Sequence, residues 1–187
     1  MTVTKHESGY KSARTLGAAE KLVAFLNTRP HADKGEGLFS SNPSTGIPGD
    51  FTEDLTQAGP ADPASLRSLR DALALTIGAE GPDAERAWSE VSRLLAPVTV
   101  RRVFTPDGVR LAPTGGEAAL GGVAAAVQAV VEADAWPRLR ICPNHKCDLV
   151  FYDATRSRTQ KWDSYETCGN RANVSAHRAR QQERQAN

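Results

Sequence analysis

The chain has 187 residues, of which 40% are hydrophobic and 24% are charged, a composition typical of a soluble globular protein and not of a disordered one. It contains no apolar run of the roughly 18 residues that a membrane helix needs, and its first residues lack the apolar stretch of a signal peptide. We therefore expect a cytoplasmic protein with no membrane partner, consisting of one domain of ordinary size and a small appendage.

Charge and cysteines are both concentrated near the C-terminus. Residues 1–137 contain 13 basic and 17 acidic residues, a net charge of −4, whereas residues 138–187 contain 10 and 5, a net charge of +5. A short basic segment on an acidic body is typical of contact with a polyanion. All three cysteines, Cys142, Cys147 and Cys168, lie in the same basic segment. An odd number of clustered thiols indicates a metal site and not a disulfide framework.

The first part of the chain has apolar residues at helical spacing. The stretch 16–27 predicts a first helix, which Thr28-Arg29-Pro30 would end. Residues 30–63 are rich in Gly, Pro, Ser and Asp, so we expect a long loop with a short helical turn at 51–55. Asp62-Pro63 offers an N-cap followed by proline at the first helical position, and this dipeptide predicts a second helix.

Two further helices and a hairpin complete the expected body. A third helix is expected between Pro82 and Pro97. Residues near 98–112 alternate around β-branched side chains on both sides of a turn, which predicts a β-hairpin. The stretch 117–134 is nearly all apolar and predicts a central helix, in which Gly121-Gly122 either weakens the helix or permits close packing. The fold class is therefore mainly α with one β-hairpin, that is, α+β.

The cysteines have the spacing of a metal-binding knuckle. Four residues separate Cys142 from Cys147, and the same spacing relates Asp163 to Cys168. Zinc takes four such ligands in tetrahedral geometry, and a carboxylate oxygen is acceptable among them. Asp163 is therefore the favoured fourth ligand.

Other arrangements of this segment stay open. The fourth ligand is alternatively a histidine, His145 or His177. A further alternative is a metal-free finger held together by Phe151, Tyr152 and Trp162, aromatic residues that so small a module needs in its interior.

These residues carry a resemblance to a known family. The segment 138–184 resembles the CGNR zinc finger, named for the Cys-Gly-Asn-Arg run that stands here at 168–171. The resemblance includes the first cysteine pair, the Phe-Tyr-Asp run at 151–153, the Arg-Ser-Arg-x-x-Lys-Trp run at 156–162, and His177-Arg178. In that family a zinc-binding cysteine usually follows the tryptophan, whereas this chain has Trp162-Asp163.

The resemblance implies two domains and a function. Residues 1–137 resemble the helical ABATE domain that usually precedes this finger, most visibly at 23–28 and 66–70. Residues 138–187 would form a treble-clef-like or knuckle zinc finger followed by a basic helix. Such proteins resemble bacterial transcription regulators in which the finger contacts DNA and the body has a sensing role, with a small-molecule effector as a further expected partner.

The basic residues of the finger are the candidate contacts to double-stranded DNA. On the expected C-terminal helix, Ala172, Ala176 and Ala179 form a narrow apolar stripe that we expect to lean on the knuckle, with a polar and basic flank on each side. Phosphate contact is the safest expectation for these flanks, and a merely solvated helix is the alternative. The candidate nucleic-acid-binding residues are Arg156, Arg158, Lys161, Arg171, His177, Arg178, Arg180 and Arg184.

Two other functions are alternatives to DNA binding. No nucleophile, acid and base stand at a spacing typical of an active site, so we do not expect an enzyme. The main alternative is a zinc-stabilised module that binds a protein or a ligand without DNA. Asn27 and its neighbours Thr28 and Arg29 are candidates for a ligand site on the body, although capping of the first helix explains Asn27 equally well.

Overall fold

The computed structural model describes residues 9–28, 62–106 and 108–186. The predicted loop at 30–61 with its turn at 51–55, and Arg29, lie outside the described residues. The α+β class is confirmed. The helices are α1 (Ala13–Leu26), α3 (Pro63–Thr76), α4 (Gly81–Leu95), α5 (Ala118–Glu132) and α6 (Asn170–Ala186), and the strands are β1 (Thr99–Thr105), β2 (Gly108–Gly115), β3 (Leu139–Ile141) and β4 (Val150–Tyr152).

Helices α1 and α3 begin at side chains that cap their first turns. The hydroxyl of Ser12 accepts from the Thr15 N–H at 3.1 Å and begins α1. The carboxylate of Asp62 accepts from the N–H groups of Ala64 and Ser65, both at 3.1 Å, and Pro63 is the first residue of α3. These contacts satisfy main-chain donors that a helix cannot pair internally, so the helix predicted from Asp62-Pro63 is confirmed.

One apolar core joins the four helices of the body. Leu22 and Phe25 of α1 and Leu69 of α3 are at most 1% exposed. α5 contacts α1, α3, α4 and β2, and this confirms the central helix expected at 117–134. Val131, near the end of α5, is 42% exposed, so the all-apolar surface of the helix is not covered along its whole length.

The predicted hairpin is a two-stranded antiparallel ribbon of β1 and β2, in which Phe104 pairs with Val109. β2 approaches α5 at a glycine: a Cβ atom on Gly121 would lie 2.6 Å from Cγ of Pro113. Such contact is too close for any side chain, so of the two alternatives for Gly121-Gly122 the structure supports close packing at Gly121. Phe104 is 78% exposed at the far end of the ribbon.

A second short hairpin, β3–β4, was not predicted and connects the body to the cysteine segment. Leu139 pairs with Tyr152, and Ile141 pairs with Val150. Leu139 and Val150 belong to the core of the body, and Tyr152 packs against it. The other side chains of this region form a separate buried cluster, namely Cys142, Cys147, Leu149, Phe151 and Cys168, with Trp162 against it.

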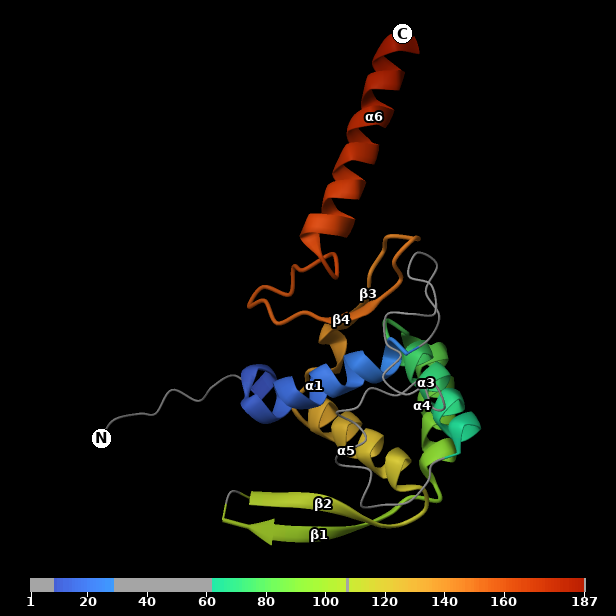
Figure 1. The fold of residues 1–187 in the computed structure, drawn as a ribbon, viewed down its shortest axis with the longest axis vertical. Helices are drawn as coiled ribbons and strands as arrows, with labels where there is room; N and C mark the ends of the chain where they lie inside the picture. The colour runs from blue at the N-terminus through green and yellow to red at the C-terminus, as the bar shows by residue number, and fades with distance from the viewer. Residues whose placement is uncertain (1–8, 29–61, 107, 187) are drawn as a thin grey trace, which may run out of the picture.

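The elements are arranged with the C-terminal helix apart from the rest. Figure 1 shows α1, α3, α4 and α5 grouped together, the β1–β2 ribbon at one end of the molecule, and α6 extending away at the opposite end. Among the described residues, no helix combines the length and the apolar character needed to span a membrane.

Candidate metal centre and basic surface

The first cysteine pair lies on a tight turn between β3 and β4. The N–H of Cys142 donates to the carbonyl of Leu149 at 2.8 Å, which closes the hairpin below the turn. The carbonyl of Asn144 accepts from Cys147 N–H at 2.7 Å and from Asp148 N–H at 3.1 Å. Asp148 adopts φ +46°, a left-handed conformation that Asp tolerates well. This main-chain arrangement directs both cysteines to the same side.

The third cysteine is positioned by a π-helical turn, Tyr165–Gly169, that leads directly into α6. The carbonyl of Ser164 accepts from Cys168 N–H at 3.0 Å and from Gly169 N–H at 3.2 Å, while the Ser164 hydroxyl accepts from Thr167 N–H at 3.3 Å. π-helical turns of this kind are rare and frequently found at functional sites. Here the turn brings Cys168 back toward the knuckle.

Four potential ligands converge between these two turns. The three Sγ atoms of Cys142, Cys147 and Cys168 and a carboxylate oxygen of Asp163 all lie within 4.8 Å of one another. His145, on the knuckle turn, and His177, on α6, are exposed and do not belong to this group in the described part of the chain. The structure thus brings together the set that the spacing favours, with neither histidine in it.

The chemistry of this group fits zinc. Asp163 Oδ1 is buried and accepts no hydrogen bond in the described structure, an arrangement that a buried carboxylate oxygen tolerates poorly without a cation. The three cysteines are free thiols, and three sulfurs with one oxygen are a tetrahedral zinc donor set. Bound zinc would hold the knuckle and the π-helical turn together as a structural site.

Burial and the neighbouring groups together set the proton affinities of these ligands. Burial raises the pKa of the Cys142 thiol and that of the Cys147 thiol. Burial also acts to raise the pKa of Asp163, but the neighbouring Cys168 and Cys142 thiols outweigh it and the net pKa is lowered. The carboxylate is therefore already in its ligating form, whereas the thiols have to release protons on binding the metal.

The Gly-Asn pair after Cys168 has a structural explanation. A Cβ atom on Gly169 would lie 2.7 Å from Cδ2 of Tyr165 and 3.2 Å from Cδ1 of Trp162, so a side chain here would displace at least one ring. The Asn170 side-chain amide donates to the carbonyl of Glu166 at 3.0 Å and fixes the π-helical turn. Both residues therefore help to place Cys168 among the ligands.

The comparison with known protein families agrees with this geometry. Residues 138–181 match the CGNR zinc finger family. The match covers β3, the cysteine knuckle, β4, the π-helical turn and most of α6, and together with the group of three cysteines and one aspartate it supports zinc binding. We refer to residues 138–181 as the CGNR finger. No curated protein matches the chain.

The predicted nucleic-acid contacts lie on the segment after β4 and on α6, which continues past residue 181 to Ala186, and all are exposed. Lys161 rests 5.1 Å from the centroid of the Trp162 ring. The candidates on the segment after β4 are Arg156, Arg158 and Lys161, and those on α6 are Arg171, His177, Arg178, Arg180 and Arg184.

The expected packing of α6 on the knuckle is wrong. Ala172 is half-buried, but Ala176 and Ala179 are exposed, and α6 extends away from the finger (Figure 1). Alanine side chains bury too little apolar area to hold a long polar helix against so small a surface. The basic residues of both flanks of α6 are consequently exposed, as are Ala176 and Ala179 of the stripe.

Two polar residues have roles that the sequence did not reveal. Asn27 is the C-cap residue of α1, and its side-chain amide pairs with the main chain of Val150 in the finger. Asp153, completely buried, organises the segment that carries Arg156 and Arg158. The Asp-x-Thr sequence at 153–155 is the one local signal that indicates such a turn.

Proposed function

We propose that the chain is a DNA-binding transcription regulator of bacterial type, in which the CGNR finger contacts duplex DNA and the body modulates the finger. This is a binding role and not a catalytic one. The proposal is carried by one observation, a basic helix with exposed arginines that extends away from a finger of zinc-binding type. Its further elements rest on charge, helix geometry and the contact between the finger and the body.

The distribution of arginines around α6 suits a groove with two phosphate backbones. At 100° per residue, Arg171 and Arg178 lie on one side of the helix, and Arg180 lies roughly 180° around from Arg171, close to Arg184. A helix about 10–12 Å wide fits a major groove about 12 Å wide. Basic residues on both sides would then reach the phosphates of either strand.

Charge supports the same partner. Residues 138–187 have a net charge of +5 and residues 1–137 one of −4, so a polyanion would be drawn to the finger and repelled from the body. Neutralised phosphates release counterions, and affinity should therefore fall steeply with salt, with a slope of about −0.9 in log K against log salt for each phosphate contacted.

The regulatory part of the proposal relies on the contact between body and finger. Leu139 and Val150 of the β3–β4 hairpin are buried in the core of the body, so the finger is attached through packed side chains and not through a flexible tether. Any ligand-induced change in the packing of α1 would be transmitted to β4. This provides a physical route by which an effector of the body would alter DNA binding.

The experiment is a salt titration of affinity for a labelled duplex of mixed sequence, followed by fluorescence anisotropy. We compare the wild-type chain with the double variant Arg178→Glu and Arg180→Glu. The matched control is Arg14→Glu with Arg67→Glu, which changes the net charge equally at exposed positions of α1 and α3.

The two double variants separate local contact from general charge. We expect the α6 variant to bind at least tenfold more weakly and its salt slope to decrease by about 1–2, while the control retains the wild-type slope. Equal losses in both variants would mean that overall charge and not α6 governs binding. A wild-type chain without salt-sensitive affinity would leave the finger as a protein-interaction module.

A further inference from the structure

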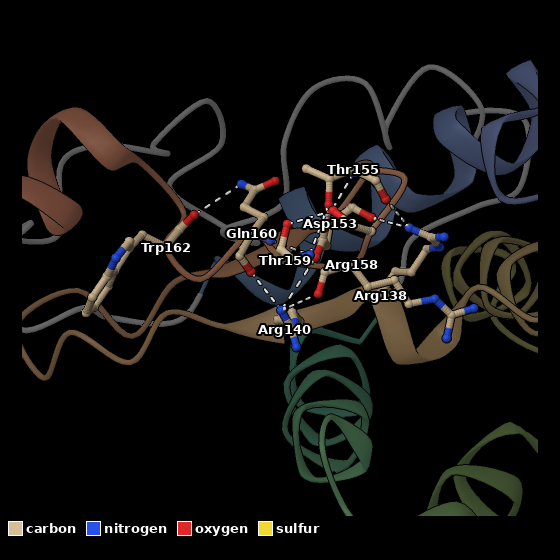
Figure 2. A network of polar contacts seen from close by, with 9 residues as sticks. Arg138, Arg140, Asp153, Thr155, Arg158, Thr159, Gln160 and Trp162 are labelled. Carbon is tan, nitrogen blue, oxygen red and sulfur yellow. Dashed lines mark hydrogen bonds and ion pairs between the residues drawn. The ribbon is translucent and has the colours of Figure 1, made fainter.

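Residues 154–161 form a loop whose shape is set from inside by Asp153. Asp153 follows β4 directly and is 0% exposed. Its Oδ1 accepts from the Thr155 N–H at 2.9 Å and from the Thr155 hydroxyl. Its Oδ2 accepts from the Gln160 N–H at 3.1 Å and lies 3.5 Å from the guanidinium of Arg140. The carboxylate therefore joins the first and last turns of the loop (Figure 2).

Two arginines hold the main-chain carbonyls of the same loop. Nη1 of Arg138 donates to the carbonyls of Asp153 at 2.9 Å and Thr155 at 2.8 Å. Nη1 of Arg140 donates to the carbonyls of Arg158 at 3.3 Å and Gln160 at 2.8 Å. Figure 2 shows both guanidinium groups directed at the loop. These two cations are therefore engaged with the protein and are not counted among the DNA contacts.

The loop is also linked to the metal centre. The Gln160 side-chain amide donates to the carbonyl of Trp162 at 3.1 Å, and the next residue is Asp163, the carboxylate of the candidate metal site. Both ends of the loop are thus fixed, one by Asp153 and the other by the segment that enters the metal centre. Within the loop, the Thr155 hydroxyl accepts from Thr159 N–H at 3.1 Å.

The side chains that this arrangement leaves outside are cationic. Arg156, Arg158 and Lys161 are exposed, and the described structure contains no ion pair for any of them. Arg158 adopts φ +55°, a conformation uncommon for a residue with a long side chain and sustained here by the surrounding hydrogen bonds. The carboxylate of Asp153 is therefore buried beneath the loop, while the three basic side chains are exposed on its surface.

We propose that residues 154–161 are a preformed phosphate-binding loop and that Asp153 is its positioning residue. The inference rests on the proposed function, because the ligand is the DNA phosphate backbone. Immobilising long side chains on binding costs free energy, and a loop that is already ordered avoids part of this cost. Asp153 thereby increases affinity for a polyanion although it carries a negative charge itself.

If Asp153 has this role, replacing it should change DNA affinity in the direction opposite to that expected from its charge alone. Removing a negative charge near DNA should strengthen binding by Coulomb attraction. If Asp153 acts through loop order, Asp153→Asn should instead weaken binding about 5–10-fold. Its salt slope should remain that of the wild type, because the same arginines and lysine still neutralise the phosphates.

The experiment measures DNA affinity and salt slope for Asp153→Asn beside a charge-matched control, Glu166→Gln, whose side chain is exposed in the same finger. Zinc content and circular dichroism verify that each variant is folded. The control should bind as tightly as the wild type or more tightly. Arg156→Gln provides the signature of a direct contact, a slope reduced by about 0.9.

A milder variant keeps the inference testable if Asp153→Asn does not fold. Thr155→Val removes the hydroxyl between Asp153 and Thr159 at an exposed position. In the free protein, ¹⁵N relaxation should report increased nanosecond motion at Arg156 and Arg158, and DNA affinity should fall about fivefold at unchanged slope.

The possible results separate this inference from the proposed function. Wild-type affinity in Asp153→Asn, or tighter binding, overturns the role of Asp153 while DNA binding by the finger stands. Unchanged loop relaxation in Thr155→Val also overturns it. If the wild-type chain has no salt-sensitive DNA affinity, the proposed function fails and this inference fails with it.

Discussion

The side-chain amide of Asn27 forms two hydrogen bonds with the main chain of Val150. Asn27 Nδ2 donates to the Val150 carbonyl, and the Val150 N–H donates to Asn27 Oδ1, both at 2.8 Å and both buried. The Asn27 amide thus pairs with the N–H and the carbonyl of Val150 on the open edge of β4, as the main chain of a neighbouring strand would. Because β4 leads directly to Asp153, the end of α1 fixes the strand from which the loop 154–161 begins.

Replacing Asn27 by alanine should destabilise the whole chain. The substitution leaves a buried donor and a buried acceptor of Val150 unpaired, and each such group costs about 1–3 kcal/mol, so we expect a loss of at least about 2 kcal/mol in the free energy of unfolding. Urea denaturation measures it. The control is Asn173→Ala on exposed α6, and equal small losses in both variants would contradict the role of the buried pair.

Replacing two helix glycines by alanine should change the free energy of unfolding in opposite directions. A Cβ on Gly17 of α1 would meet nothing within 4 Å, whereas a Cβ on Gly121 of α5 would lie 2.6 Å from Pro113 Cγ. Gly17→Ala should stabilise the chain by about 0.5–1 kcal/mol through helix propensity. Gly121→Ala should destabilise it by about 1–3 kcal/mol, because the ribbon must move.

Thermal or urea unfolding of both glycine variants tests this contrast. If Gly121→Ala were as stable as Gly17→Ala, β2 would have no fixed position against α5, and the close packing described for Gly121 would not hold in solution.

The helices were predictable from sequence because their information is local. Caps such as Asp62 and apolar residues at helical spacing such as Leu66, Leu69 and Leu73 determine them without knowledge of the rest of the fold. The β3–β4 hairpin has only three residues in each strand, too few for an alternating pattern. Of its residues on one face, Leu139 is 3% exposed and Ile141 is 38% exposed, a difference that depends on where the body ends.

The metal site was predictable in part for a similar reason. Cysteine spacing and charge are properties of the local sequence, so the segment and the favoured ligand set could be proposed. The choice of Asp163 over His145 or His177 depends on the path of two turns in space, as does the accessibility of α6. The buried pairing of Asn27 with Val150 joins residues 123 positions apart, and no local pattern indicates it.

Gly169→Ala should disturb the aromatic residues beside Cys168. The added methyl group meets Tyr165 Cδ2 at 2.7 Å and Trp162 Cδ1 at 3.2 Å, and overpacking of this kind costs about 1–3 kcal/mol. Tyr165 is 66% exposed and can move, so the cost should be near the lower limit. Trp162 fluorescence and urea denaturation report the change.

A double-mutant cycle identifies the ring responsible. In a Tyr165→Ala background the methyl group has more room, and Gly169→Ala should then cost less than in the wild-type chain. The interaction free energy between the two sites should be at least about 0.5 kcal/mol, as for residues in contact. Strict additivity would show that the requirement for glycine arises elsewhere.

Asp163 should determine how tightly the finger holds its metal. Its carboxylate oxygen lies with the three cysteine sulfurs within 4.8 Å, and we expect one zinc per chain in protein purified without added metal. Asp163→Ala removes a direct ligand and should weaken zinc binding by more than the roughly 10–100-fold that loss of an outer-shell partner costs. Asp163→Cys completes a set of four cysteine ligands and should retain zinc at least as tightly as the wild type.

Elemental analysis and competition with a chromogenic chelator measure zinc binding in both variants, with Glu166→Ala as the control for loss of an exposed acid nearby. If zinc affinity were the same in Asp163→Ala as in the wild type, a water molecule or another side chain would complete the site.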